Sequence, residues 1–178
     1  MQPVIPYVSA ELREPADIVD AIRRRRGGHL INLDRMLLHS LPFARGWNAF
    51  LGEVRRNLSL SPKLREIAIC GVAVLNGADY EFIHHAPELL AAGGTQAQVD
   101  QLRTIENLNT DLSMFSALEQ DAIRLTWHMT REVTVPKPLT ERLHQALGPT
   151  QFVELVGVIA TYNMVSRFLI ALGVTPED

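Results

Sequence analysis

The sequence predicts an all-α fold, and three observations support this prediction. Apolar residues recur at intervals of three and four through most of the chain, which is the spacing of one helix face. No segment alternates convincingly between apolar and polar residues, and no glycine-rich loop follows a strand-like segment. Serine, threonine, proline and glycine stand where the apolar segments begin and end, as they do at the ends of helices. We therefore expect a single domain in the form of a multi-helix bundle.

The length and composition narrow the class of protein. A chain of 178 residues, 47% apolar and 21% charged, is long enough to bury a core and too apolar to be disordered. Its net charge of -3 gives no general attraction to nucleic acid or anionic membranes, so we expect neither as a partner. The single cysteine, Cys70, cannot form an intrachain disulfide, and no secretory signal pattern opens the chain. These features fit a cytoplasmic protein.

An extended arm is expected over residues 1–14, which contain two prolines and show no helical period, ahead of a helical domain at 15–178. The first helix should begin near Pro15 and end after four consecutive arginines at positions 23–26. Four arginines could bind phosphate, but cations are also favourable at a helix C-terminus. We favour a solvated helix end over phosphate or nucleic-acid binding.

The next three helices are defined by apolar spacing and by their first residues. Two are predicted over 32–39 and 42–54 from residues spaced along one helix face. The following helix should begin with Ser61 as its N-cap and Pro62 in its first turn. Because residues 67–75 are apolar on every side, this helix should lie at the centre of the fold.

The remaining helices are marked by capping residues, prolines and glycines. The last helix is the most apolar, but Glu154, Asn163 and Arg167 interrupt it. We therefore expect a buried helix rather than a membrane span. Of these five helices, three begin at Asp79, Thr95 and Ser116. The fourth follows a short link at 136–138 and ends at Gly148, and the last begins at Pro149.

The best candidate for chemistry is the pair of Glu81 and His85, which share a helix face because they stand four residues apart. A carboxylate that orients an imidazole beside a pocket suits proton transfer near neutral pH. On a helical wheel His85 lies at the edge of an apolar arc, whereas His84 points to the opposite side, towards solvent or a partner subunit. The arc comprises Phe82, Ile83, Ala86, Leu89 and Leu90, and the opposite side carries Tyr80 and Glu88.

Each candidate also has a purely structural interpretation. Glutamate–histidine pairs at this spacing are common on ordinary helices. Glu66 heads an apolar helix and would be costly to bury without a partner, but it could instead complement the helix N-terminus and pair with Lys63 or Arg65. Three polar residues of the last helix could line the same pocket, with the arginine binding an anion, or could form an internal hydrogen-bond network. They are Tyr162, Asn163 and Arg167.

No metal site is expected. His84 and His85 point to different sides of a regular helix, so they cannot bind one ion together. Glu81 and His85 supply two ligands, whereas catalytic zinc usually has three from the protein.

Two segments resemble the carboxymuconolactone decarboxylase and AhpD-like alkylhydroperoxidase superfamily. In the peroxidase branch a glutamate is followed, after eleven residues, by Cys-x-x-Cys and, after three more residues, by a histidine. Counted from Glu66, the two cysteine positions fall on Ala78 and Glu81, and the histidine position falls on His85. The glutamate and the histidine are kept and both cysteines are replaced. The segment LNGADYEFIHHAPELLAAGGT resembles the decarboxylase branch, over a match of roughly 42–102, and YNMVSRFLIALGV is a weaker likeness.

The missing cysteines favour the decarboxylase branch. Peroxide reduction in this superfamily needs a thiolate and a resolving thiol, and neither Ala78 nor Glu81 can supply one. The resemblance implies an AhpD-like fold and cofactor-free decarboxylation of a small carboxylated lactone or related organic acid. It also implies assembly into trimers or hexamers.

On this resemblance we assign His85 as proton shuttle, Glu81 as its orienting group and Glu66 as a second acid/base or orienting group. The cation that would bind a substrate carboxylate stays unassigned. There are two alternatives to this assignment. The first is a catalytically silent binding or assembly protein with the same fold, and the second is a thiol-dependent antioxidant enzyme.

Overall fold

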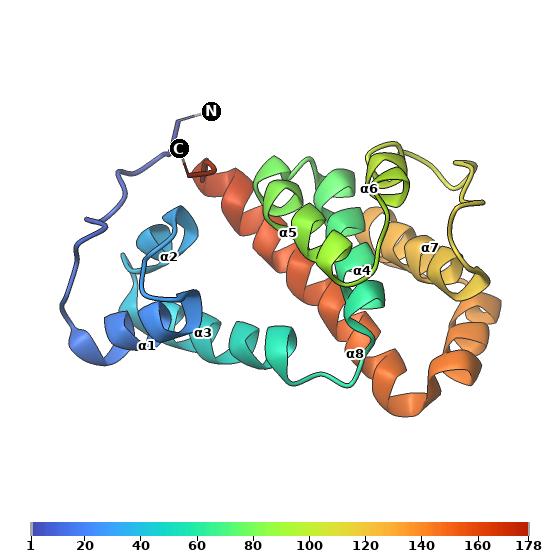
Figure 1. Ribbon diagram of the computed structural model, residues 1–178, viewed down its shortest axis with the longest axis horizontal. Helices are drawn as coiled ribbons and strands as arrows, with labels where there is room; N and C mark the ends of the chain where they lie inside the picture. The colour runs from blue at the N-terminus through green and yellow to red at the C-terminus, as the bar shows by residue number, and fades with distance from the viewer. Residues whose placement is uncertain (1, 178) are drawn as a thin grey trace. The chain divides into compact units, whose positions relative to one another are not determined.

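The computed structural model describes residues 2–177, and all regular secondary structure in this range is helical (Figure 1). The all-α prediction is therefore confirmed. The eight helices are α1 (Ala16–Arg26), α2 (Asn32–Leu37), α3 (Leu41–Arg56), α4 (Pro62–Asn76), α5 (Asp79–Ala91), α6 (Gln96–Leu102), α7 (Ala117–Arg131) and α8 (Lys137–Leu172).

The helices form two compact units. The first comprises residues 1–58 and 169–178, and the second comprises residues 59–168. Helices α1, α2 and α3 belong to the first unit, and α4 to α7 with most of α8 belong to the second.

The first unit packs α1 and α2 against α3. Its core includes Val19 and Ile22 of α1, Met36 of α2 and Trp47 of α3, each at most 5% exposed. Residues 2–14 form neither helix nor strand. Hydrogen bonds hold this arm, including one from the Val4 N–H to the Leu172 carbonyl at 3.0 Å.

The four arginines at the end of α1 do not form the solvated helix end that we predicted. Arg23 donates to the carbonyls of Gly28 and of two residues of the arm. Arg25 and Arg26 donate to Asp34, whose side chain is fully buried. Only Arg24 of the four is exposed. The prediction was wrong because it considered the helix alone, without the carboxylate that α2 places beside it.

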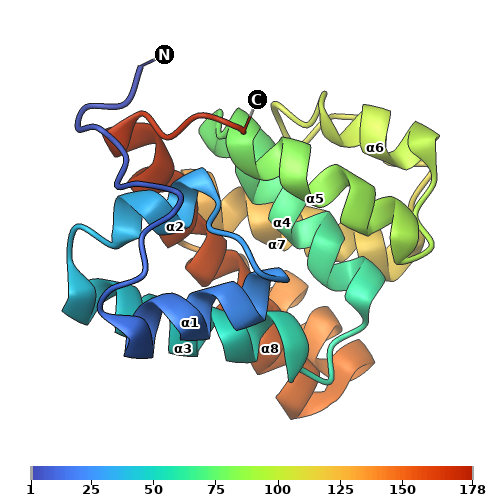
Figure 2. The ribbon, with the colours of Figure 1, turned by 60° about the vertical axis from the view of Figure 1, so that its left-hand side comes forward.

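The second unit is built around α4, as its uniformly apolar sequence predicted. Ile67, Ala68, Ile69 and Cys70 are all 0% exposed. Helix α4 packs closely against α5 and α7, and α6 contacts both α4 and α5. Figure 2 shows α4 and α5 side by side. The central helix is therefore covered on several sides by its neighbours.

The ends of the helices agree in part with the predicted capping. Thr95 and Ser116 form the expected capping boxes. Ser61 precedes α4 but makes no capping hydrogen bond through its side chain, and Asp79 is the first residue of α5 rather than its N-cap. Gly77 ends α4 in the left-handed conformation with φ 70°, which glycine adopts readily.

Helix α8 consists of two helical stretches that meet at Gly148, whose φ of 71° and ψ of 173° are not helical. The two last helices predicted from the sequence meet at this residue. By length and composition α8 could cross a membrane. However, Leu155, Val158 and Ile159 are 0% exposed and Tyr162 is 1% exposed, so α8 is a core helix.

Candidate active site

Helices α4 and α5 bring three candidate residues together. Glu66 lies in the second turn of α4, and Glu81 and His85 lie one turn apart on α5. The two helices are joined by the short turn at Gly77, so they fold back on one another and Glu66 meets His85 across 19 residues of sequence. The hairpin thus joins a local pair to a carboxylate distant in sequence.

Each nitrogen of the His85 ring faces a carboxylate. The Nδ1 atom lies 2.6 Å from Oε2 of Glu66, and Nε2 lies 3.3 Å from Oε2 of Glu81. The first distance is that of a strong, charge-assisted hydrogen bond, and the second that of a weaker contact. Glu66 is therefore the group that fixes the orientation of the ring.

The charge on Glu66 is stabilised by two neighbours, His85 and Arg65. Burial raises the pKa of this carboxyl, but the hydrogen bond and charge of His85 and those of Arg65 outweigh burial and leave the pKa below its usual value. The Arg65 Nε donates to Oε1 of Glu66 at 3.0 Å. Glu66 is thus a carboxylate with both oxygens engaged, and it stays ionised at neutral pH.

The three side chains are deeply buried. Those of Glu66 and Glu81 are 5% exposed and that of His85 is 2% exposed. The edge of the His85 ring meets Tyr162 of α8, with ring centres 5.1 Å apart. This environment strengthens electrostatic interactions and holds the imidazole in one orientation, which is what proton transfer at a fixed point requires.

The three polar residues of α8 have different surroundings. Tyr162 contacts His85, but Asn163 donates to the Thr130 hydroxyl of α7 at 3.0 Å. Arg167 donates to the side-chain oxygen of Asn163 at 2.6 Å. Asn163 also accepts a hydrogen bond from Asn76 of α4. The network interpretation therefore describes Asn163 and Arg167, while Tyr162 belongs beside the imidazole.

The helical wheel of α5 is correct for His85 and wrong for several neighbours. Ile83 and Leu90 were placed on the apolar arc but are 51% and 39% exposed, whereas Tyr80 on the opposite side is buried. His84 is half-buried, contacts the carbonyl of Tyr80 through Nδ1 and stacks on its ring. The wheel fails there because α4 and α6 both pack on α5, so more than one side of the helix is covered.

A pocket of about 450 Å³ lies beside the same hairpin. Its lining includes Phe82 of α5, Arg103 after α6 and Arg131 of α7. The Arg103 guanidinium lies 4.0 Å from the centre of the Phe82 ring. Sequence reasoning did not find these arginines, because neither stands in a recognisable motif and only the tertiary fold brings them to one pocket.

The lone cysteine is unsuited to nucleophilic chemistry. Cys70 is 0% exposed, and burial, together with the charges of Glu66 and Glu81, raises the pKa of its thiol far above its usual value. Within residues 2–177, no cluster of three histidine, cysteine, aspartate or glutamate side chains could hold a metal ion. The groups that meet at the hairpin, an imidazole and two carboxylates, are suited to acid–base chemistry.

The fold is shared with known proteins. Two crystal structures of uncharacterized peroxidase-related proteins share the fold. The protein from Silicibacter sp. TM1040 gives a TM-score of 0.79 at 16% identity, over 99% of this chain and 95% of that one. The protein from Ralstonia eutropha JMP134 is described as an alkylhydroperoxidase AhpD core. It gives a TM-score of 0.80 at 17% identity, over 100% of this chain and 95% of that one.

No curated protein matches the sequence. Residues 42–108 match the model of the carboxymuconolactone decarboxylase family, a segment that contains Glu66, Glu81 and His85. The chain has a single cysteine, so the Cys-x-x-Cys pair of the peroxidase branch is absent. Residues 42–108 are therefore similar to the carboxymuconolactone decarboxylase family, the chain has the fold of the two peroxidase-related structures, and it lacks the paired cysteines.

Proposed function

We propose that this chain is a cofactor-free enzyme that decarboxylates a small carboxylated lactone or related organic acid by proton transfer through His85. The observation that carries the proposal is the buried imidazole held between Glu66 at 2.6 Å and Glu81 at 3.3 Å. A histidine oriented by one carboxylate and close to a second is an arrangement suited to general acid–base catalysis.

In the proposed reaction the bond between the substrate and its carboxylate breaks, and carbon dioxide leaves without the electron pair. The pair passes into the conjugated carbonyl of the substrate and forms an enolate. The enolate carbon then takes the proton from Nε2 of His85, and solvent later returns a proton to the ring. The shorter contact favours Glu66 as the orienting group and Glu81 as the group that exchanges a proton with Nε2, so the orienting role first given to Glu81 passes to Glu66.

The pocket beside the hairpin offers Arg103 and Arg131 to a substrate carboxylate, although Asp79 and Glu106 line it as well. Its lining includes Phe82, the residue next to Glu81 in the chain, but none of the three acid–base residues. Productive binding therefore requires the substrate to pass beyond Phe82, or that side chain to move. An assembly of three or six copies in the cytoplasm belongs to the same proposal, and light scattering on the purified protein tests the assembly.

A catalytically silent binding protein is the second candidate, and one observation favours it. The side chains of Glu66, Glu81 and His85 are at most 5% exposed, which is also expected of a network that only stabilises a helix pair. Thiol peroxidase chemistry is less well supported because Cys70 is buried and its pKa is raised.

Replacing His85 separates the two candidates. Carbon dioxide release is measured with a panel of carboxylated lactones and β-keto acids for the wild type, His85→Ala, Glu66→Gln and Glu81→Gln. Loss of a general acid should lower kcat by roughly 10²- to 10⁴-fold in His85→Ala. Glu66→Gln should lower it more than Glu81→Gln, because the shorter contact orients the ring.

The pair of His128, in α7, and Glu132, the C-cap residue that follows this helix, provides a matched control. It has the same spacing and a 2.8 Å contact, but the Glu132 side chain is 47% exposed. His128→Ala should leave kcat unchanged. Equal losses in His128→Ala and His85→Ala, or full activity of a folded His85→Ala variant, would remove the catalytic assignment.

A further inference from the structure

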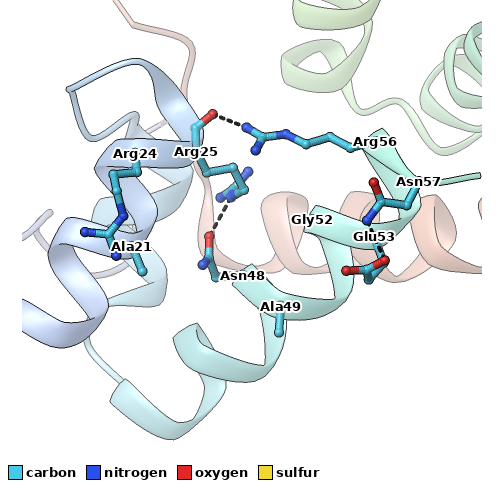
Figure 3. A pocket seen from close by; sticks show the side chains of 9 residues that line it. All are labelled: Ala21, Arg24, Arg25, Asn48, Ala49, Gly52, Glu53, Arg56 and Asn57. Atoms are coloured by element: carbon cyan, nitrogen blue, oxygen red, sulfur yellow. Dashed lines mark hydrogen bonds between the residues drawn. The ribbon is translucent and has the colours of Figure 1, made fainter.

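A second pocket, of about 380 Å³, lies between α1 and α3 within the first unit (Figure 3). Three arginines contribute to it: Arg24 and Arg25 from the end of α1, and Arg56 from the end of α3. Asn48 and Asn57 add amide groups, and three small residues leave room between the helices. The small residues are Ala21, Ala49 and Gly52.

Positive charge is concentrated at this pocket. Residues 20–26 and 48–57 contain six arginines and two acidic residues, in a chain whose net charge is -3. The buried carboxylate of Asp34 neutralises one of these arginines. The region therefore keeps a positive excess that its own acidic residues do not balance, and such a region attracts anions.

The three arginines retain donors that the fold does not use. Arg25 donates through Nε to Asn48 at 2.5 Å and through Nη2 to Asp34 at 3.1 Å. Arg56 donates through Nη2 to the carbonyl of Arg25 at 2.6 Å, and Arg24 makes no hydrogen bond with a described residue. Because each guanidinium has five N–H groups, the exposed side chains of Arg24 and Arg56 keep donors that a ligand can reach, whereas the Arg25 side chain is 8% exposed.

The arginines are close enough to disfavour one another's charge. Burial, and then the charge of Arg26 with those of Arg55 and Arg56, lower the pKa of Arg25 to about 10, although Asp34 acts in the opposite direction. Arg25 is still charged at neutral pH. Cations near helix C-termini are ordinarily favourable. That effect alone does not explain why arginines of two helices line the same pocket.

We propose that this pocket binds a small molecule that carries one phosphate group. A phosphate monoester places two negative charges and three acceptor oxygens on a single group, which matches convergent guanidinium donors. The volume lies in the usual range for small-molecule sites. Glu53, whose carboxylate accepts a hydrogen bond from Asn57, also lines the pocket and disfavours a ligand with further anionic groups, such as a nucleic-acid strand.

Isothermal titration calorimetry on the full chain tests the proposal. The probes are inorganic phosphate and phenyl phosphate, with sodium chloride at matched ionic strength and a single-stranded oligonucleotide as separate titrants. Saturable binding of either phosphate probe is expected, and comparison of the two shows whether the ester group contributes. Arg24→Gln and Arg56→Gln should each weaken binding about tenfold or more, because each removes charge-assisted hydrogen bonds.

Arg45→Gln is the matched control, because Arg45 is an exposed arginine of α3 that pairs with Asp17 and does not line the pocket. This variant should bind phosphate as the wild type does. Circular dichroism confirms folding, and Arg24→Gln serves if Arg56→Gln fails to fold, since the Arg24 side chain makes no internal hydrogen bond. The proposal is overturned if neither phosphate probe binds, if Arg45→Gln weakens binding equally, or if only the oligonucleotide binds.

Discussion

The chain contains two buried charge clusters of opposite design. In the first unit, a carboxylate, Asp34, lies between the cations Arg25 and Arg26. In the second unit, an imidazole, His85, lies between the carboxylates Glu66 and Glu81. The central side chains of both clusters are at most 2% exposed, so burial alone does not distinguish a structural cluster from a catalytic one.

The difference lies in how fully the central group is bound. Both oxygens of Asp34 accept two hydrogen bonds each, from the two arginines and from the Ile31 N–H. Its cationic partners remain charged over the whole physiological pH range. The cluster joins the end of α1 to the start of α2.

The His85 cluster is built from groups that can change their protonation. One of its two contacts is short at 2.6 Å and the other is long at 3.3 Å, so one side of the ring is held more tightly than the other. The looser side is where a proton can leave. The difference between these two distances is therefore a better indication of function than the number of charged groups in the cluster.

The largest expected effect comes from breaking the first cluster. Asp34→Ala leaves two arginines and one backbone N–H without their buried acceptor, which should lower the free energy of unfolding by about 3–5 kcal/mol. Urea unfolding followed by circular dichroism measures the change. The matched control is Asp17→Asn, which alters an exposed pair with Arg45 and should cause no measurable loss. A loss in Asp34→Ala no greater than in the control would show that the cluster does not stabilise the fold.

A smaller, pH-dependent effect is expected in the second cluster. His85→Ala leaves two buried carboxylates near one another and should lower the free energy of unfolding by about 2–3 kcal/mol at pH 7. The variant also removes the hydrogen bond and charge of His85, which are the main influences that lower the pKa of Glu66 below the unfolded value of 4.5. A carboxyl with a lowered pKa favours the folded state above the unfolded pKa, and that contribution is lost as pH falls through the folded pKa.

The part of the loss in His85→Ala that comes from Glu66 should therefore be fully present at pH 7 and should shrink as pH falls below 4.5. Urea unfolding of this variant and the wild type at pH 7, 5 and 4 measures the change. If the loss is the same at pH 4 as at pH 7, the charge of Glu66 does not contribute to the stability of the second cluster.

The sequence predicts the contacts between residues that are close together in the chain, and it does not predict those between residues far apart in the chain. Glu81 and His85 meet because helix geometry fixes the distance between residues four apart. Glu66 joined the site through its place in a family motif, since no spacing rule predicts a contact across 19 residues. The bond from Asp34 to Arg26 depends on a reversal at Gly27 and Gly28, whose φ angles are 78° and 106°.

The sequence also predicts which helix is central better than which side of a helix is buried. Helix α4 is apolar on every side, so its position needs no knowledge of its neighbours. Ile83 of α5 is exposed although it lies beside buried residues on the wheel, because only the packing of α4 and α6 decides which sides of α5 are covered. The same reason explains why Arg103 and Arg131 were not recognised as lining one pocket.

The smallest expected effect concerns Cys70, which lies close enough to the second cluster for both carboxylates to act on it. Burial, followed by the charges of Glu66 and Glu81, raises the pKa of the thiol well above its usual range, and Arg103 only partly opposes this. The native protein should therefore react with a disulfide reagent such as dithionitrobenzoate at pH 8 only as fast as it unfolds, and at the full rate in urea. Cys70→Ala should cost about 1 kcal/mol of stability and leave any slow peroxide consumption unchanged. Rapid thiol labelling of the folded chain, or peroxide consumption that disappears with this substitution, would revive the thiol-dependent alternative and would mean that the buried carboxylates serve the cysteine rather than His85.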